Sequence, residues 1–254
     1  MYDHIAVTDE GSTRVVTMQR AHRRNSLSED HLRELQHALD EAAGSDARAV
    51  IIAAEGPVFS SGHDFADMLD RDLGSTTEFL ELCTEVMTTI PRMPQPVVAQ
   101  VEGAALAAGC QLVASCDLAV AGESTWFVLP GGKAGWGCTT PAVAVARAVG
   151  RKRALEMLLT GEPIDAATAL AWGLVNRVVP DGEVAGAARA LATAASGGSA
   201  SEKGITKAAF HRQVDLPTDE AYELAIGVMA ASSQRPPGKE NMAAFVEKRP
   251  AVYD

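Results

Sequence analysis

Long apolar runs and positive charge are what this chain lacks most. No apolar run approaches the roughly 18 residues that a membrane-spanning helix needs, and the first residues contain no basic segment followed by an apolar one. The 22 Lys and Arg residues are outnumbered by 33 Asp and Glu, for a net charge of −11, whereas nucleic acids select basic surfaces. We therefore expect a cytoplasmic protein that binds neither membranes nor nucleic acid. A few local Lys and Arg residues would still suffice for a small ligand that carries phosphate.

Cysteine is also scarce. The four cysteines, Cys83, Cys110, Cys116 and Cys138, form no C-x-x-C pair, and no His pair stands near them at zinc-ligand spacing. We expect buried free thiols in a reducing compartment, and no metal site.

Several catalytic and nucleotide-binding motifs are missing as well. There is no G-x-S-x-G elbow, and Ser61, His63 and Asp64 are too close in sequence for a triad, which is assembled from distant segments. The glycine-rich residues 131–137 match neither G-x-G-x-x-G nor G-x-x-x-x-G-K-[ST]. We expect this segment to form a turn at the wall of a pocket.

The pattern of apolar residues predicts an α/β fold. With 254 residues, 47% of them hydrophobic, the chain can bury a sizeable core. Strands are predicted at 14–18, 49–53, 96–101 and 117–121, with one helix capped by Ser28 and another at 79–90 that stops before Pro91. The all-apolar strand at 49–53 should be covered on both faces. Strands separated by helices of this length favour right-handed crossovers.

After residue 140 the pattern becomes mostly helical, and the last 70 or so residues predict three or four helices. Helix starts are predicted at Thr140 (N-cap) with Pro141 and at Asp165, and helix ends at Gly150, Gly161 and Gly173.

Two segments rich in small residues are the most informative feature of the chain. They are residues 59–65 (FSSGHDF) and 103–111 (GAALAAGCQ). Each follows a strand-like run and leads into a helix-like pattern, so each places free backbone N–H groups at a helix N-terminus. Two such turns facing each other would form an oxyanion hole for a thioester carbonyl.

These segments belong to a longer set of motifs. The set comprises residues 24–27, 59–65, 96–99, 108–112, 116–119, 160–164, 173–175 and 245–249. In this order, and over essentially the whole chain, they resemble the crotonase family, also called the enoyl-CoA hydratase/isomerase family. The resemblance implies an α/β fold with a crotonase-like spiral core of ββα units, residues 1–190. It also implies a C-terminal helical region, residues 191–254, that serves oligomerisation and closes over CoA.

The same resemblance implies a ligand and its binding residues. The ligand is an acyl-CoA thioester of fatty acid metabolism, with no cofactor beyond the CoA of the substrate, and the assembly is a homotrimer or a dimer of trimers. The backbone N–H groups of His63 and Ala108 form the oxyanion hole. The residues implied in CoA binding are His22, Arg23, Arg24, His63, Asp64, Phe65, Ala66, Phe245 and Lys248, the last two on a helix that often comes from a neighbouring subunit.

The chain departs from the family where protons are transferred. Hydration of an enoyl thioester needs a base that activates water and an acid that protonates the α-carbon, and the family's hydratases use two glutamates. Gln111 and Gly131 stand at those positions, and residues 136–140, which align with a carboxylate of the isomerases, contain no acid. An amide is not basic near neutral pH, although Gln111 can orient a water or hold a carbonyl group.

Four groups are candidate substitutes: Asp64, Asp67, Cys138 and the His63 side chain. We expect Asp64 to cap the helix after the first motif and Asp67 to face solvent on that helix. Cys138 is a nucleophile only if its surroundings lower its pKa. The His63 imidazole has a suitable ordinary pKa, but it can act only if it faces the acyl group.

Three hypotheses remain open. The chain is an acyl-CoA enzyme with weak or altered chemistry, a non-catalytic acyl-CoA binder or carrier, or a structural subunit beside an active paralogue. If the scaffold and the oxyanion hole are intact, Gln111→Glu combined with Gly131→Glu is expected to raise the hydration of crotonyl-CoA.

Overall fold

Pairs of strands followed by helix make up the repeating unit of the fold. The computed structural model describes residues 2–253. Its first half contains β1 (Ile5–Glu10), β2 (Thr13–Met18), η1 (Ala21–Arg23), α1 (Glu29–Ala43), β3 (Ala49–Ala54), β4 (Val58–Ser60), α2 (Phe65–Met68), α3 (Leu73–Arg92), β5 (Val97–Val101), β6 (Ala104–Leu106), α4 (Ala108–Ser115), β7 (Leu118–Gly122) and β8 (Trp126–Val128). The second half contains α5 (Gly131–Ala134), α6 (Thr139–Val149), α7 (Arg151–Thr160), β9 (Ile164–Asp165), α8 (Ala166–Trp172), β10 (Arg177–Val179), η2 (Asp181–Glu183), α9 (Val184–Ser196), α10 (Ala200–Gln213), α11 (Thr218–Gln234) and α12 (Pro236–Glu247). The predicted α/β class, with ββα units followed by helices, is confirmed.

From β3 to β8 the two strands of a unit join different sheets, whereas β1 and β2 pair with each other in one sheet. One sheet has the order β1-β2-β3-β5-β7-β10, and the other has the order β4-β6-β8-β9. Strands β4, β6 and β8 are parallel. Because the carboxyl ends of parallel strands share one edge, the turns after these three strands emerge together. Those turns hold residues 61–64, 107–108 and 129–131.

Strand β3 is buried on both faces, as predicted. Val50 and Ile52 pack in the main core with residues of α1 and α3, whereas Ile51 packs in a second cluster with Val184 and Ala188 of α9. Full burial of such a side chain contributes about 2 kcal/mol. Helix α9 therefore covers the sheet, and the predicted boundary at residue 190 lies within this helix, which ends at Ser196.

Most predicted helix caps are confirmed. The Ser28 hydroxyl accepts a hydrogen bond from the His31 N–H at 3.4 Å, and Asp165 accepts one from the Thr168 N–H at 2.8 Å. The ends of α6, α7 and α8 are at Gly150, Gly161 and Gly173.

Two predictions about proline are wrong. Helix α3 continues through Pro91 to Arg92, because a proline in the last turn removes only one helical hydrogen bond. Helix α6 begins at Thr139 with Cys138 as its N-cap, so Pro141 is its third residue. The missing N–H of Pro141 does no harm there, since first-turn N–H groups have no partner within the helix.

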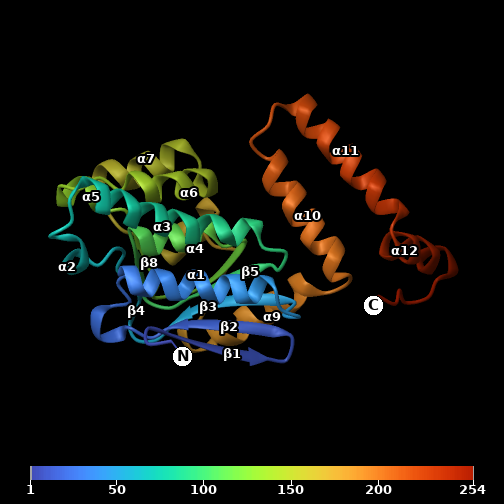
Figure 1. Ribbon diagram of the computed structural model, residues 1–254, viewed down its shortest axis with the longest axis horizontal. Coiled ribbons are helices and arrows are strands. Elements are labelled where there is room, and N and C mark those ends of the chain that lie inside the picture. The colour runs from blue at the N-terminus through green and yellow to red at the C-terminus, as the bar shows by residue number, and fades with distance from the viewer. Residues whose placement is uncertain (1, 254) are drawn as a thin grey trace.

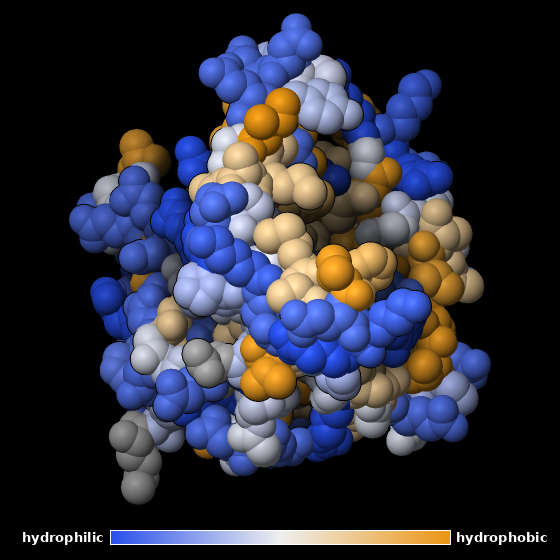
Figure 2. Space-filling model, turned by 90° about the vertical axis from the view of Figure 1, so that its right-hand side faces the viewer, coloured by the Kyte–Doolittle hydropathy of each residue, from blue (hydrophilic) through white to orange (hydrophobic). Residues whose placement is uncertain are grey.

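Helices α10, α11 and α12 form an arm that stands away from the core (Figure 1). Lys207 of α10 fixes the arm: its Nζ donates to the carbonyls of Ile90 and Gln95, both at 2.7 Å, and pairs with Asp117 at 2.6 Å. Apolar side chains of the arm are exposed, namely Phe210, Tyr222, Ile226, Met229, Met242, Phe245 and Val246. Seen from the side of the arm, apolar side chains surround a hollow in the surface (Figure 2). Exposed apolar surface of this kind is typical of contact regions.

Candidate functional site

The turns after β4 and β6 lie against each other. A Cβ atom built on Gly62 would lie 3.0 Å from the Ala107 Cβ and 3.3 Å from the Ala108 nitrogen, and one on Gly109 would lie 2.5 Å from the Ser60 carbonyl oxygen. Gly62 also has a φ of 88°, which glycine adopts without strain. The two glycines thus permit the close approach that the predicted oxyanion hole requires.

The N–H groups of His63 and Ala108 are unused. Within residues 2–253, no backbone carbonyl accepts a hydrogen bond from either of them. Ala108 is the first residue of α4, so its N–H has no partner in the helix. The neighbouring N–H groups are engaged, that of Asp64 with the Leu27 carbonyl at 3.0 Å and that of Ala107 with the Val128 carbonyl at 2.9 Å. The two free donors therefore lie in turns whose backbone is held in place by the hydrogen bonds of the neighbouring N–H groups.

Ala107 is strained. Its φ of 48° and ψ of −114° lie in a region that residues other than glycine rarely adopt. Such a conformation costs about 1–3 kcal/mol and concentrates at functional sites. Because the Ala107 N–H is tied to β8, this strain is held in place by the sheet that carries the turns.

The His63 imidazole packs against α3. Its ring lies 5.2 Å from that of Phe79, its Nε2 lies 3.3 Å from the Cys83 sulfur, and the Trp136 ring is 5.8 Å away. Burial lowers the pKa of His63 to about 4. The ring is therefore neutral near pH 7, and it is enclosed by apolar side chains and a thiol. This environment does not suit it to proton transfer.

Acidification is expected to destabilise the fold through His63 and His31. Burial lowers the pKa of each to about 4, from an ordinary value of 6.5. The unfolded chain then binds protons first, so stability is retained above pH 6.5 and is lost as the pH falls toward 4. Urea unfolding should show about 2 kcal/mol less stability per histidine at pH 5 than at pH 7. His63→Phe should reduce this pH dependence, and an unchanged dependence would contradict the role of His63.

Asp64 is held by the segment that precedes α1. Its carboxylate accepts hydrogen bonds from the Ser26 hydroxyl at 2.9 Å, Arg23 at 3.1 Å and Arg20 at 3.3 Å. It also accepts from the Ala66 N–H at 3.2 Å, which confirms that it caps α2. Although burial favours the protonated form, the bonds from Ser26 and Arg23 hold the pKa of Asp64 below its ordinary value. The Asp64 carboxylate is therefore ionised and already accepts several hydrogen bonds, which leaves it poorly suited as a general base.

The prediction that Asp67 faces solvent is correct only in part, because its side chain is half-buried and its carboxylate is engaged. Its Oδ2 accepts a hydrogen bond from the Glu29 N–H at 2.8 Å and lies 3.4 Å from Arg71 Nη2. Glu29 is the first residue of α1, whose N–H has no partner within its own helix. Asp67 thus caps α1 from a distant part of the chain, a role that no local pattern reveals.

Gln111 is the fourth residue of α4, the helix that begins at Ala108. Only 4% of its surface is exposed, and its Oε1 has no hydrogen-bond partner within residues 2–253. A buried polar atom without a partner calls for an explanation, and a bound ligand supplies one.

Gly131 has no room for a side chain. A Cβ there would lie 2.1 Å from the Trp136 carbonyl oxygen and 2.6 Å from both the nitrogen and the sulfur of Cys138. The loop 136–138 therefore fills the space that a second glutamate would need. The expectation that Gly131→Glu would supply a carboxylate is wrong for this backbone.

Cys138 is not an activated nucleophile. Its sulfur accepts a hydrogen bond from the Gly131 N–H at 3.2 Å, and burial raises the pKa of its thiol. All four cysteines are unpaired, as predicted, with Cys116 half-buried and the others buried. Burial raises the pKa of Cys83 and Cys110 to about 12.

The predicted CoA-binding residues near the N-terminus surround the first turn. His22, Arg23 and Arg24 are exposed on and after η1. The Ser61 N–H donates to the Arg24 carbonyl at 3.0 Å, which joins this segment to the turn after β4.

The remaining predicted CoA-binding residues are divided between α2 and α12. Phe65 and Ala66 are exposed on α2, and the Phe65 ring meets that of Trp136 edge-to-face, with 5.8 Å between the ring centroids. Phe245 and Lys248 lie at the end of α12, at the opposite end of the molecule from α2 (Figure 1). Within one chain, the predicted CoA-binding residues of α12 are therefore far from those of α2.

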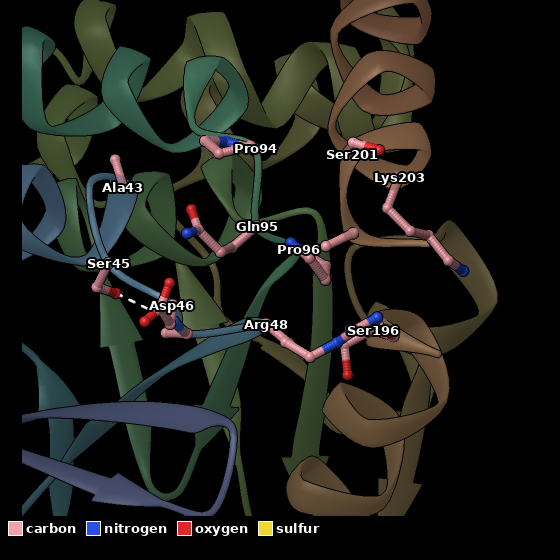
Figure 3. Close-up of a pocket in the computed structure, with 12 residues that line it drawn as sticks. Ala43, Ser45, Asp46, Arg48, Pro94, Gln95, Pro96, Ser196, Ser201 and Lys203 are labelled. Carbon is pink, nitrogen blue, oxygen red and sulfur yellow. Dashed lines mark hydrogen bonds between the residues drawn. The ribbon is translucent and has the colours of Figure 1, made fainter. Parts of the chain in front are cut away.

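A cavity of about 400 Å³ lies elsewhere, at the amino ends of β3 and β5 (Figure 3). Arg48 reaches from the core to the end of α9, where its Nη2 donates to the Ser196 carbonyl at 2.9 Å. Gln95 extends toward Ala43 and Ser45 (Figure 3). The lining contains none of the predicted site residues, so the cavity belongs to the junction between core and arm.

Within residues 2–253, no three His, Cys, Asp or Glu side chains gather as metal ligands would. Over the same residues, no helix is both long enough and apolar enough to cross a membrane.

Comparison with known proteins gives a consistent result. Residues 8–254 match the family model described as enoyl-CoA hydratase/isomerase. The rat protein named enoyl-CoA hydratase domain-containing protein 3, mitochondrial, is 44% identical over 94% of this chain and 81% of its own length. The solved structure of human enoyl-CoA hydratase domain-containing protein 3 is 40% identical, with a TM-score of 0.95, and covers 99% of this chain and 100% of that one. An enoyl-CoA hydratase structure from Mycobacterium smegmatis is 38% identical, with a TM-score of 0.96, and covers 99% of both chains.

Proposed function

Since the chain belongs to the enoyl-CoA hydratase/isomerase family, we propose that it binds an acyl-CoA thioester of fatty acid metabolism and polarises the thioester carbonyl. The carbonyl oxygen accepts hydrogen bonds from the N–H groups of His63 and Ala108. One observation carries this proposal: these two donors are unused, in turns that Gly62 and Gly109 bring into contact. Removing such a donor typically costs an enzyme about 3 kcal/mol of transition-state stabilisation.

The nucleotide end of CoA is proposed to lie over η1 and α2. The exposed basic side chains of His22, Arg23 and Arg24 are there, beside the turn that holds His63. Phe245 and Lys248 then close the site from the arm of a neighbouring chain in a homotrimer or a dimer of trimers. The exposed apolar side chains of the arm support an assembly of this kind.

Ordinary hydration is expected to be slow or absent. Gln111 supplies no acid or base, and Gly131 is enclosed by the loop 136–138. These two observations also favour the second candidate, a non-catalytic acyl-CoA binder or carrier. A cytoplasmic location stays a prediction, and the rat and human relatives carry the word mitochondrial in their names.

Calorimetric titration with CoA, acetyl-CoA and crotonyl-CoA tests the proposal. We expect micromolar binding of the thioesters, weaker binding of CoA alone, and little loss of crotonyl-CoA absorbance at high protein concentration. Turnover of any thioester would favour an enzyme over a carrier. A failure of all three ligands to bind would contradict the proposal.

A further inference from the structure

The segment 65–72, which contains α2, borders the proposed thioester site but is not anchored in the core. None of its residues is buried, and the side chains of Phe65, Leu69 and the next residue after the segment, Leu73, are largely exposed. Helix α2 has only four residues, too few to be stable alone. A segment with so few buried apolar contacts opens easily unless polar contacts hold it. Because it begins two residues after His63, its position bears directly on the turn after β4.

Arg71 supplies the polar contacts that hold this segment. Its Nε donates to the Asp67 carbonyl at 2.9 Å, and its Nη1 donates to the Ser75 carbonyl at 3.3 Å. Its Nη2 pairs with Glu29 at 2.6 Å and lies 3.4 Å from the Asp67 carboxylate. The guanidinium thereby joins α2, the start of α3 and the first residue of α1. Only 17% of the Arg71 side chain is exposed, so solvent screens these contacts only in part.

The same guanidinium is linked to the turn after β4 through an aromatic ring. Its Cζ lies over the Phe79 ring, 5.0 Å from the centroid, and the Phe79 ring meets the His63 imidazole edge-to-face at 5.2 Å. Phe79 is buried. A cation is attracted to the face of an aromatic ring, and the attraction is stronger where the pair is shielded from water. Arg71, Phe79 and His63 therefore form a continuous chain of contacts.

We propose that Arg71 is a positioning residue of the thioester site, an inference that rests on the proposed function. The guanidinium holds the segment 65–72 against α1 and α3. Its contact with Phe79 fixes the position of His63, whose N–H is proposed to hold the thioester carbonyl. Such a donor is effective only within about 2.7–3.1 Å of the oxygen, so a small displacement of the turn weakens the hydrogen bond. Arg71 acts through Phe79 and His63, not by contact with the thioester.

Arg71→Met removes the guanidinium and keeps an apolar stem of similar length. The test measures calorimetric affinity for acetyl-CoA and the infrared carbonyl band of bound acetyl-CoA labelled with ¹³C at the thioester carbonyl. In the wild-type chain, the bound band should lie at lower frequency than in free acetyl-CoA, because the two N–H donors polarise the carbonyl. The variant should bind acetyl-CoA about tenfold more weakly, and its bound band should return about halfway to the free position.

The chain offers a matched control and a second variant. Arg14→Met changes an arginine of similar exposure, 19%, that pairs with Asp9 on the six-stranded sheet, and it should alter neither measurement. Glu29 also pairs with Arg33 at 2.5 Å, so Arg71→Met leaves no carboxylate unpaired there and should fold. If it does not fold, Arg71→Lys carries the test. Lysine keeps the charge but lacks the planar fork that makes three separate contacts, so its band should lie between those of the other two chains.

A double-mutant cycle tests the route through the ring. Phe79→Leu removes the ring between Arg71 and His63, so Arg71→Met combined with it should lose little more affinity than either change alone. Additive losses would overturn the role of Phe79.

The infrared band separates the remaining outcomes. If the wild-type chain shows the lowered band and the folded Arg71 variants match it in both band and affinity, the positioning role is overturned and the proposed function stands. If the wild-type chain does not bind acetyl-CoA, or binds it with the band of the free thioester, the proposed function itself fails.

Discussion

Gly131→Ala should lower the free energy of unfolding by about 3 kcal/mol, because overpacking at a rigid site forces the backbone to move. The new Cβ would meet the Trp136 carbonyl oxygen at 2.1 Å and the Cys138 nitrogen at 2.6 Å. Both are backbone atoms that cannot rotate away as a side chain does. The hydrogen bond from the Gly131 N–H to the Cys138 sulfur would be lost as the loop shifts. Urea unfolding followed by circular dichroism measures the change.

Gly137→Ala is the matched control in the same loop. A Cβ on Gly137 would contact only the Thr139 Cγ2 at 3.9 Å, an ordinary van der Waals distance. Its effect should stay within about 0.5 kcal/mol, as for most substitutions that create no clash. Equal stabilities of the two variants would show that the loop 136–138 does not enclose Gly131.

Ala108→Pro is expected to reduce turnover of a thioester by about 10²-fold or more, since proline has no N–H and one oxyanion donor disappears. The proline ring would also occupy the space in front of the missing N–H. Helix α4 should persist, because proline is favoured at the first position of a helix. Binding titrations of acetyl-CoA and CoA complete the measurement: the thioester should lose affinity, whereas CoA, which has no thioester carbonyl, should bind nearly as before.

Ala200→Pro makes the same substitution at the first residue of α10, on the exposed arm. It should preserve both affinity and turnover. If Ala108→Pro binds and turns over thioesters like the wild-type chain, the N–H of Ala108 plays no part in holding the carbonyl.

The sequence predicts the architecture well because its signals are local. The all-apolar run at β3, the cap at Ser28 and the cap at Asp165 each follow from a few neighbouring residues. The turns at His63 and Ala108 are also identifiable from their small residues and their positions after strands.

The parts of the site that the sequence does not reveal depend on contacts across the fold. The enclosure of Gly131 arises from the path of the loop 136–138, and the N–H that Asp67 caps belongs to a helix far away in sequence. Likewise, the partners of Asp64 on the segment before α1 are fixed only when β4 is in place. No spacing rule encodes such contacts.

In the repeated units, the strands that stabilise the fold are separate from the turns that form the candidate site. In the units β3–β4, β5–β6 and β7–β8, the longer first strand lies in the six-stranded sheet, while the three-residue second strand only delivers a turn to the site edge. The turns at that edge thus lie outside the six-stranded sheet. This division is compatible with a neutral amide at residue 111 and a glycine at residue 131, and it makes the turns at this edge the natural place for new reactions to evolve.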